Sequence, residues 1–139
     1  DPYILGVLIG DGNMTGPGVN FSCAEPDLLE IVKLQLPGNV TLNKIQGDNC
    51  DYYVNGGEQK GRGHHNPVVK ALKDLGLMYF RSEHKFIPNL YKYNSIAVRL
   101  AILQGLLDTD GSVSSEGCIE FSSSSLQLTQ DVRELVWSL

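Results

Sequence analysis

The stretch ILGVLIGDGN at residues 4–13 decides the fold, because a related stretch, LQGLLDTDGS, occurs at residues 103–112. At an offset of 99 residues, the two stretches share a glycine, a leucine and an Asp-Gly pair: Gly6 with Gly105, Leu8 with Leu107, Asp11 with Asp110, and Gly12 with Gly111. With one inserted residue the similarity continues, so that Phe21 aligns with Phe121. Matches that keep their order over this distance indicate an internal repeat.

Both copies predict the same order of elements: a helix that ends at the Asp-Gly pair, a short strand pair, and an amphipathic helix. The expected elements are Pro2–Asp11, Val19–Cys23 and Pro26–Leu36 in the first copy, and Ser95–Asp110, Cys118–Ser123 and Leu126–Leu139 in the second. Asp1 and Ser95 are suitable N-caps. We expect Gly12 and Gly111 to end the two motif helices in the left-handed C′ conformation.

The first copy continues into elements that the second does not reach. They are a hairpin with strands Val40–Ile45 and Tyr52–Asn55 around the turn Gly47-Asp48-Asn49, and a helix Pro67–Leu75 that ends at Gly76. The sequence therefore predicts an α+β fold, with one half at residues 1–94 and the start of a second, incomplete half at residues 95–139.

Glycine is an unusual choice at positions 6 and 105, because a mid-helix glycine costs about 1 kcal/mol relative to alanine. A glycine on the apolar face allows two helix backbones to approach closely. If the motif helices pack at Gly6 and Gly105, they bring Asp11 and Asp110 together at one end.

Each of these aspartates stands in the last turn of its helix, where a carboxylate faces the negative end of the macrodipole. Two close carboxylates repel each other unless cations lie between them, as in two-metal phosphodiesterase sites. The repeat thus predicts a shared divalent-cation site.

With these motifs in place, the chain resembles the LAGLIDADG homing endonucleases. ILGVLIGDG and LQGLLDTDG resemble their paired motifs, and His84-Lys85-Phe86-Ile87-Pro88 is similar to their Lys-x-Ile-Pro block. The segment from Asn66-Pro67 to Gly76-Leu77 is similar to the short helix that precedes this block in intein endonucleases. The resemblance implies two central motif helices packed together, with strands that form a mixed antiparallel sheet.

The resemblance also implies roles for individual residues. Asp11 and Asp110 would be the metal-binding catalytic acids, and the backbone carbonyls of Gly10 and Thr109 further ligands of Mg²⁺, for which Mn²⁺ can substitute. Lys85 would be the catalytic lysine beside the scissile phosphate. Asp108 has only Ile9 as its counterpart, and we expect it to be structural or to support the metal ligands.

The resemblance implies double-stranded DNA as the partner, with the strands in the major groove, and a host protein in cis if the chain is part of an intein. With part of the second half absent, we expect weak DNA binding and no efficient double-strand cut. When full length, the enzyme would be a monomer. The formal net charge of −5 argues against a nucleic-acid partner for the chain as a whole. Residues 58–92, however, hold seven basic and three acidic side chains. Lys44, Lys60 and Arg62 are candidate DNA-binding residues.

Composition limits the other classes of protein. Three scattered cysteines indicate neither a disulfide framework nor a CxxC metal site. No apolar run reaches the roughly 18 residues of a membrane span, and no signal-peptide pattern opens the chain, so we expect a soluble intracellular protein, cytoplasmic if prokaryotic.

Two alternatives remain open at this stage. The first is a LAGLIDADG-derived DNA-binding domain or RNA maturase that does not cleave. The second is a phosphatase of the haloacid-dehalogenase type, because Asp108-Thr109-Asp110-Gly111 resembles its signature, with Asp108 as the nucleophile. That signature must follow a buried strand, whereas residues 95–107 have the length and pattern of a capped helix.

Overall fold

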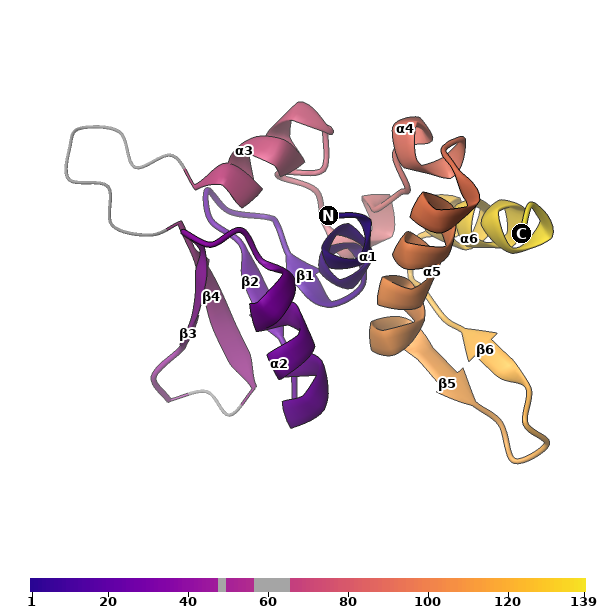
Figure 1. Cartoon of the computed structure of the whole chain (residues 1–139), viewed down its shortest axis with the longest axis horizontal. Helices are drawn as coiled ribbons and strands as arrows, with labels where there is room; N and C mark the ends of the chain where they lie inside the picture. The colour runs from indigo at the N-terminus through magenta and orange to yellow at the C-terminus, as the bar shows by residue number, and fades with distance from the viewer. Residues whose placement is uncertain (48–49, 57–65) are drawn as a thin grey trace. The chain divides into compact units, whose positions relative to one another are not determined.

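The computed structural model describes residues 1–47, 50–56 and 66–139, which form the α+β structure expected from the sequence. The chain divides into two compact units (Figure 1). One unit joins residues 1–11 to residues 80–139, and the other consists of residues 12–79. The units cut across the two sequence halves, because the first motif helix packs with the second.

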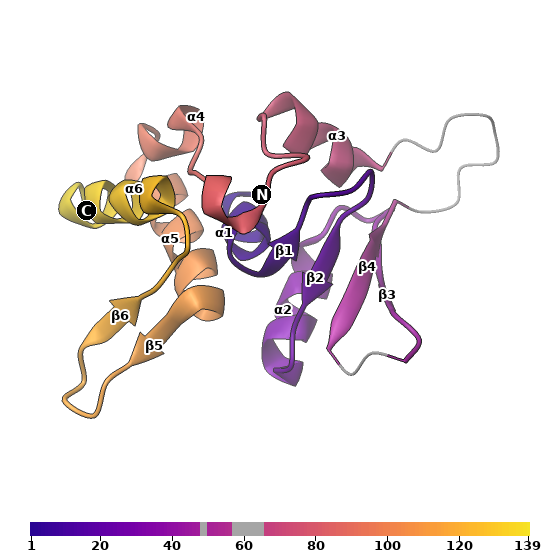
Figure 2. The same cartoon turned by 180° about the vertical axis from the view of Figure 1, so that it is seen from behind.

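The two motif helices, α1 (Pro2–Asp11) and α5 (Ile96–Asp110), lie side by side in the first unit (Figures 1 and 2). Asp1 caps α1, since its carboxylate accepts a hydrogen bond from the backbone N–H of Ile4 at 3.0 Å. The hydroxyl of Ser95 caps α5 in the same way. Both helices therefore begin and end where the sequence predicts.

The first unit contains several further elements. They are the short 3₁₀ turn η1 (Ser82–His84), α4 (Asn89–Lys92), the antiparallel strands β5 (Gly111–Val113) and β6 (Ile119–Phe121), and α6 (Leu126–Trp137). The core side chains come mainly from α1, α5 and α6: Val7, Leu8, Ile9, Ile102, Leu106, Leu128 and Leu135.

The second unit contains a four-stranded antiparallel sheet in the order β1-β2-β4-β3. Its elements are β1 (Gly12–Asn13), β2 (Asn20–Ser22), α2 (Pro26–Gln35), β3 (Thr41–Lys44), β4 (Asp51–Asn55) and α3 (Pro67–Asp74). Phe21 and Val54 are buried, whereas their strand neighbours Ser22 and Asn55 are exposed. One sheet face is thus polar. Of the predicted hairpin turn, Asp48 and Asn49 lie outside the described residues.

The sequence repeat is also a repeat of structure. The order helix, strand, strand, helix occurs twice, as α1-β1-β2-α2 and as α5-β5-β6-α6. Even the strand registers agree: Gly12 lies opposite Phe21, and Gly111 lies opposite Phe121. The single inserted residue lies between the strands of the second pair, so it changes neither register.

The expected left-handed ends of the motif helices are wrong. Gly111 has φ −88° and ψ 151°, and Gly12 is not among the glycines with positive φ. Both helices run directly into a strand, which requires extended backbone at that point. What Gly111 supplies is space, since a Cβ there would overlap the carbonyl group of Leu107. The helix end predicted at Gly76 is confirmed, and there the glycine does have a left-handed backbone, with φ 72°.

Candidate active site at the ends of the paired helices

Two glycines allow the backbones of α1 and α5 to touch. A Cβ on Gly6 would overlap the carbonyl oxygen of Ile102, and a Cβ on Gly105 would overlap the carbonyl oxygen of Tyr3. Tyr3 and Ile102 are themselves equivalent at the repeat offset of 99 residues. The contact is therefore reciprocal. Gly6 and Gly105 lie at the interface between the two motif helices, as expected from the sequence.

The helices run parallel, so their carboxyl ends lie together. One turn beyond the glycine contact, Gly10 lies against the side chain of Thr109, whose hydroxyl donates to the carbonyl oxygens of Gly105 and Leu106 at 3.0 Å. A Cβ on Gly10 would lie 3.4 Å from Oδ2 of Asp110. The absence of a side chain at Gly10 thus leaves room for the acid of the other helix.

Asp11 and Asp110 are half-buried at this end, and their environment disfavours negative charge. Burial and then repulsion from Asp110 raise the pKa of Asp11 from 3.8 to about 6, against the opposing effect of Lys85. Burial raises the pKa of Asp110 as well, again opposed by Lys85. The two carboxylates therefore lie within electrostatic reach of each other, at a point where a cation would stabilise both.

Lys85 brings an ammonium group to the same place. Its side chain is buried, with 7% of the residue exposed, and Nζ donates to the carbonyl oxygen of Gly10 at 2.6 Å. Burial lowers the pKa of Lys85, while Asp110 and Asp11 oppose this shift. The structure therefore brings together the three residues expected to be catalytic, although they come from three separate stretches of sequence.

Residues 97–139, which comprise most of α5, the β5-β6 pair and α6, match the LAGLIDADG-like domain family. The chain carries a LAGLIDADG-type domain. This match confirms the resemblance to the homing-endonuclease family that was predicted from the two motifs. Its helix, hairpin and helix are also the elements that repeat at the start of the chain.

The chain is also similar to replicative DNA helicases named DnaB. It is 30% identical to that of Nostoc sp. and 26% identical to that of Rhodothermus marinus, each over 148 positions that cover 98% of the chain. A shorter match to that of Mycobacterium intracellulare is 45% identical over 56 positions, or 40% of the chain. The chain spans only 17%, 16% and 10% of these three helicases, respectively.

The side chains of the LAGLIDADG site suit a hard divalent cation. In the described part of the chain, no cluster of three or more His, Cys, Asp or Glu side chains forms a complete cage. Mg²⁺ does not require one, because it keeps several waters and uses one or two carboxylates plus substrate phosphates. Asp11 and Asp110 are two carboxylates that lie within electrostatic reach of each other. The Gly10 carbonyl retains a second lone pair beside the bond from Lys85.

The middle of α5 excludes the phosphatase alternative. The residues before Asp108 belong to a 15-residue helix, so the signature does not follow a buried strand. Instead, Oδ2 of Asp108 accepts a hydrogen bond from the hydroxyl of Tyr3 at 2.8 Å. Asp108 thus links the two motif helices of the LAGLIDADG domain.

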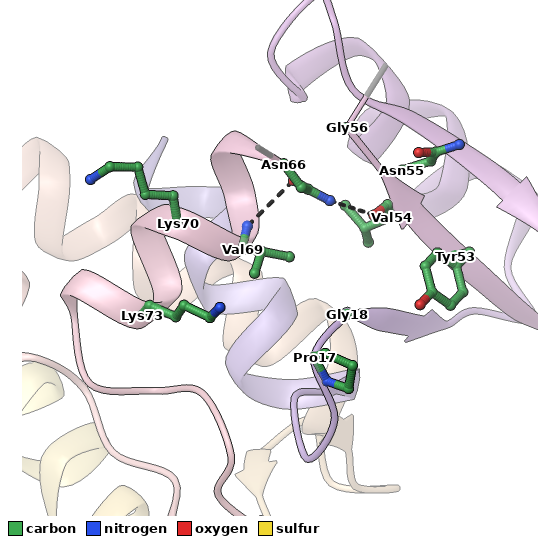
Figure 3. Close-up of a pocket in the computed structure, with 10 residues that line it drawn as sticks. All are labelled: Pro17, Gly18, Tyr53, Val54, Asn55, Gly56, Asn66, Val69, Lys70 and Lys73. Atoms are coloured by element: carbon green, nitrogen blue, oxygen red, sulfur yellow. Dashed lines mark hydrogen bonds between the residues drawn. The ribbon is translucent and has the colours of Figure 1, made fainter. Parts of the chain in front are cut away.

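The polar face of the sheet in the second unit holds a set of residues that sequence reasoning missed. The strand registers align four exposed or half-exposed side chains in one row: Asn13, Asn20, Tyr53 and Asn43. Polar alternation along β2 and β4 was the available signal, but it needed the register to become a surface. Tyr53, which is 46% exposed, also lines a hollow of about 530 Å³ with Lys70 and Lys73 (Figure 3).

The candidate DNA-binding lysine Lys44 lies on β3, adjacent in sequence to Asn43 and opposite Tyr52. Because successive strand residues point to opposite faces, Lys44 and the polar row lie on different faces of the sheet. The other two candidates, Lys60 and Arg62, lie outside the described residues. Across residues 1–47, 50–56 and 66–139, no helix is long and apolar enough to cross a membrane.

Proposed function

We propose that this domain is a site-specific DNA endonuclease that hydrolyses phosphodiester bonds with a divalent cation. One observation supports this function above all others. Asp11 and Asp110 lie at the same end of two parallel helices, and the buried ammonium group of Lys85 is within electrostatic reach of both. Folding alone does not favour this arrangement, because burial raises the pKa of both carboxyl groups.

Each residue has a distinct chemical role in this proposal. Asp11 and Asp110 bind Mg²⁺, or Mn²⁺ in its place, together with the carbonyl oxygens of Gly10 and Thr109. A divalent cation at that position supplies Lewis acidity toward the scissile phosphate. Lys85 offsets the negative charge that develops on the phosphate oxygens, and its fixed position avoids reorganisation during the reaction.

The polar face of the sheet is the surface that we assign to the DNA bases. Asparagine side chains can donate and accept at once, which matches the edge of adenine in the major groove. Asn13, Asn20 and Asn43 provide three such groups in one row, with Tyr53 between the last two. Lys60 and Arg62 remain candidates for phosphate contacts, which add affinity without sequence preference. Lys44 lies on the opposite face of the sheet and is not assigned to this surface.

The host of this domain is a replicative DNA helicase of the DnaB kind, and the domain is part of an intein within it. Nearly the whole chain aligns with two such helicases, yet it corresponds to about a sixth of their length. An endonuclease carried as an insertion accounts for both facts. Its DNA target is then the helicase gene at the point where the insertion is absent.

The test is cleavage of a supercoiled plasmid that carries this uninterrupted helicase site. We expect nicked or linear product with Mg²⁺ or Mn²⁺ and none with EDTA. Asp11→Asn and Asp110→Asn should each lower the rate by at least about 100-fold. The matched control is Asp27→Asn, which removes an exposed carboxylate from the first turn of α2 and should cleave as the wild type does.

Binding is measured on the same plasmid site by mobility shift in the presence of Ca²⁺. The proposed roles require that both active-site variants bind the DNA nearly as well as the wild type does. Specific binding without any nicking under either metal would overturn the endonuclease and favour the non-cleaving DNA-binding domain. Equal cleavage by the wild type and Asp11→Asn would show that the paired carboxylates are not the active site.

A further inference from the structure

The segment that carries Lys85 is held in place by two buried side chains of α6. These are Ser125, which is 0% exposed, and Asp131, which is 2% exposed. One contacts the backbone at Lys85 itself, and the other contacts the backbone two residues later. Neither side chain belongs to the motifs that identify the active site.

Ser125 holds the backbone carbonyl of Lys85. Its hydroxyl donates to this oxygen at 2.6 Å and at the same time accepts from the backbone N–H of Leu128 at 3.1 Å. The N-cap of α6 thus forms a direct link to the lysine segment. An N-cap needs only the second of these bonds, so the first one is additional to helix capping.

Asp131 holds the other side of the segment. Its Oδ2 accepts from the backbone N–H of Ile87 at 2.9 Å, and its Oδ1 accepts from Nζ of Lys92 at 2.7 Å and from Nε2 of Gln127 at 3.0 Å. All three donor groups bond to one carboxylate. Lys92 also pairs with Glu134 at 3.0 Å, so its charge keeps a partner even without Asp131.

A carboxylate is an unexpected choice at this point of α6. The buried neighbours on this helix are apolar, namely Leu128, Val132 and Leu135. Replacing a buried ion pair with apolar side chains is often neutral or stabilising, so fold stability alone gives little reason for an acid here. An acid does have a use that an apolar side chain lacks, because it can accept a hydrogen bond from the Ile87 amide.

We infer that Ser125 and Asp131 are positioning residues for the active-site lysine, an inference that rests on the proposed endonuclease function. They fix the backbone at Lys85 and at Ile87, so the side chain of Lys85 leaves the segment in one direction. That direction takes Nζ to the carbonyl of Gly10, beside Asp11 and Asp110. α6 thus determines where the ammonium group lies without touching the reacting atoms.

The first experiment measures the position of Lys85 without any DNA. Each protein is labelled with an amine-reactive reagent, and the rate at every lysine is read by mass spectrometry. In the wild type, Lys85 should react far more slowly than the exposed Lys70. Asp131→Asn and Ser125→Ala should each accelerate labelling of Lys85 by about tenfold or more. The single oxygen left by Asp131→Asn cannot accept from both Ile87 and Lys92, and Ser125→Ala removes the bond to the Lys85 carbonyl.

The matched control is Glu134→Gln, which removes a partner of Lys92 but no bond to the lysine segment. It should leave the labelling of Lys85 unchanged. Should both α6 variants fail to fold, hydrogen exchange of the wild type still tests the inference, since the Ile87 amide must be protected. A fast-exchanging Ile87 amide, or an unchanged rate at Lys85 in folded Asp131→Asn, would overturn it.

The second experiment is single-turnover cleavage together with DNA binding. Asp131→Asn should cleave about tenfold more slowly with an unchanged Kd, because the lysine is misplaced while the DNA-binding sheet is intact. Glu134→Gln should cleave normally. If the wild type cleaves nothing although Asp131→Asn exposes Lys85, the proposed function fails and the positioning by α6 stands. A normal cleavage rate in Asp131→Asn overturns the positioning role.

Discussion

Gly6→Ala tests whether the closeness of the motif helices is a requirement of the fold. An ideal Cβ at Gly6 would lie 2.3 Å from the carbonyl oxygen of Ile102 and 3.1 Å from Cα of Gly105. Favourable non-bonded contact begins at about 3.5 Å, so the helices must separate by about 1 Å. Overpacking of this kind costs about 3 kcal/mol, whereas the better helix propensity of alanine returns about 1 kcal/mol.

The expected net loss is therefore about 2 kcal/mol, which for a chain of this size lowers Tm by about 6–8 °C. Thermal and urea denaturation followed by circular dichroism measure this loss. Gly38→Ala is the matched control, because a Cβ there would meet nothing within 4 Å and its φ is not positive. It should stay within about 0.5 kcal/mol of the wild type.

A rise in stability of Gly6→Ala would refute the reasoning. If helix propensity alone mattered, Gly6→Ala would melt higher than the wild type, and the inferred backbone contact would be wrong. The reciprocal position offers an independent check, since a Cβ on Gly105 would overlap the carbonyl of Tyr3. Gly105→Ala should therefore destabilise the protein by a similar amount.

Further measurements address the charges, the helix pair and the sheet. Because the pKa of Asp11 is raised from 3.8 to about 6, the contribution of this carboxyl group to folding stability is greatest below pH 3.8 and is lost as pH rises through 6. The Tm of the metal-free wild type should accordingly fall relative to that of Asp11→Asn as pH rises from 3.8 to about 6, and Mg²⁺ should reverse this fall. Parallel profiles of Tm against pH for the two proteins would contradict this expectation. Tyr3→Phe removes the bond to Asp108 and should cost about 1 kcal/mol in urea denaturation. Tyr53→Ala should weaken binding of the cognate DNA and relax its sequence preference, whereas Lys44→Ala, on the opposite face of the sheet, should change neither, as mobility shifts would show.

The helix pair could be predicted from the sequence because its signals are local. Gly6 and Gly105 are costly where they stand, and their spacing from Asp11 and Asp110 is the same in both copies. Because the free-energy cost of a mid-helix glycine recurs at equivalent positions of both copies, the two glycines indicate one shared helix contact. An N-cap also depends only on residues close in sequence, so the start of α1 at Asp1 was predictable too.

The surroundings of Lys85 could not be predicted, because they depend on long-range contacts. The sequence shows a lysine in a loop, and only the fold reveals that Ser125 and Asp131 hold its segment from 40 and 44 residues away. The polar row on the sheet needed strand register, which polar alternation does not determine. The conformation of Gly111 was misread because a positive φ and a lack of space for a Cβ select the same residue.

The helix pair is symmetric in its backbone contacts but not in the side chains at its carboxyl end, and this asymmetry bears on how the site works. Gly6 and Gly105 exchange equivalent contacts, but at the helix ends Gly10 faces Thr109, and Lys85 bonds to the Gly10 carbonyl. The equivalent glycines therefore build a scaffold that brings two acids together, while a segment held by α6 places the ammonium group of Lys85. Because Nζ of Lys85 bonds to the carbonyl of the residue before Asp11, the surroundings of Asp11 and Asp110 differ. Under the proposed function, the two acids then take different parts in one hydrolysis.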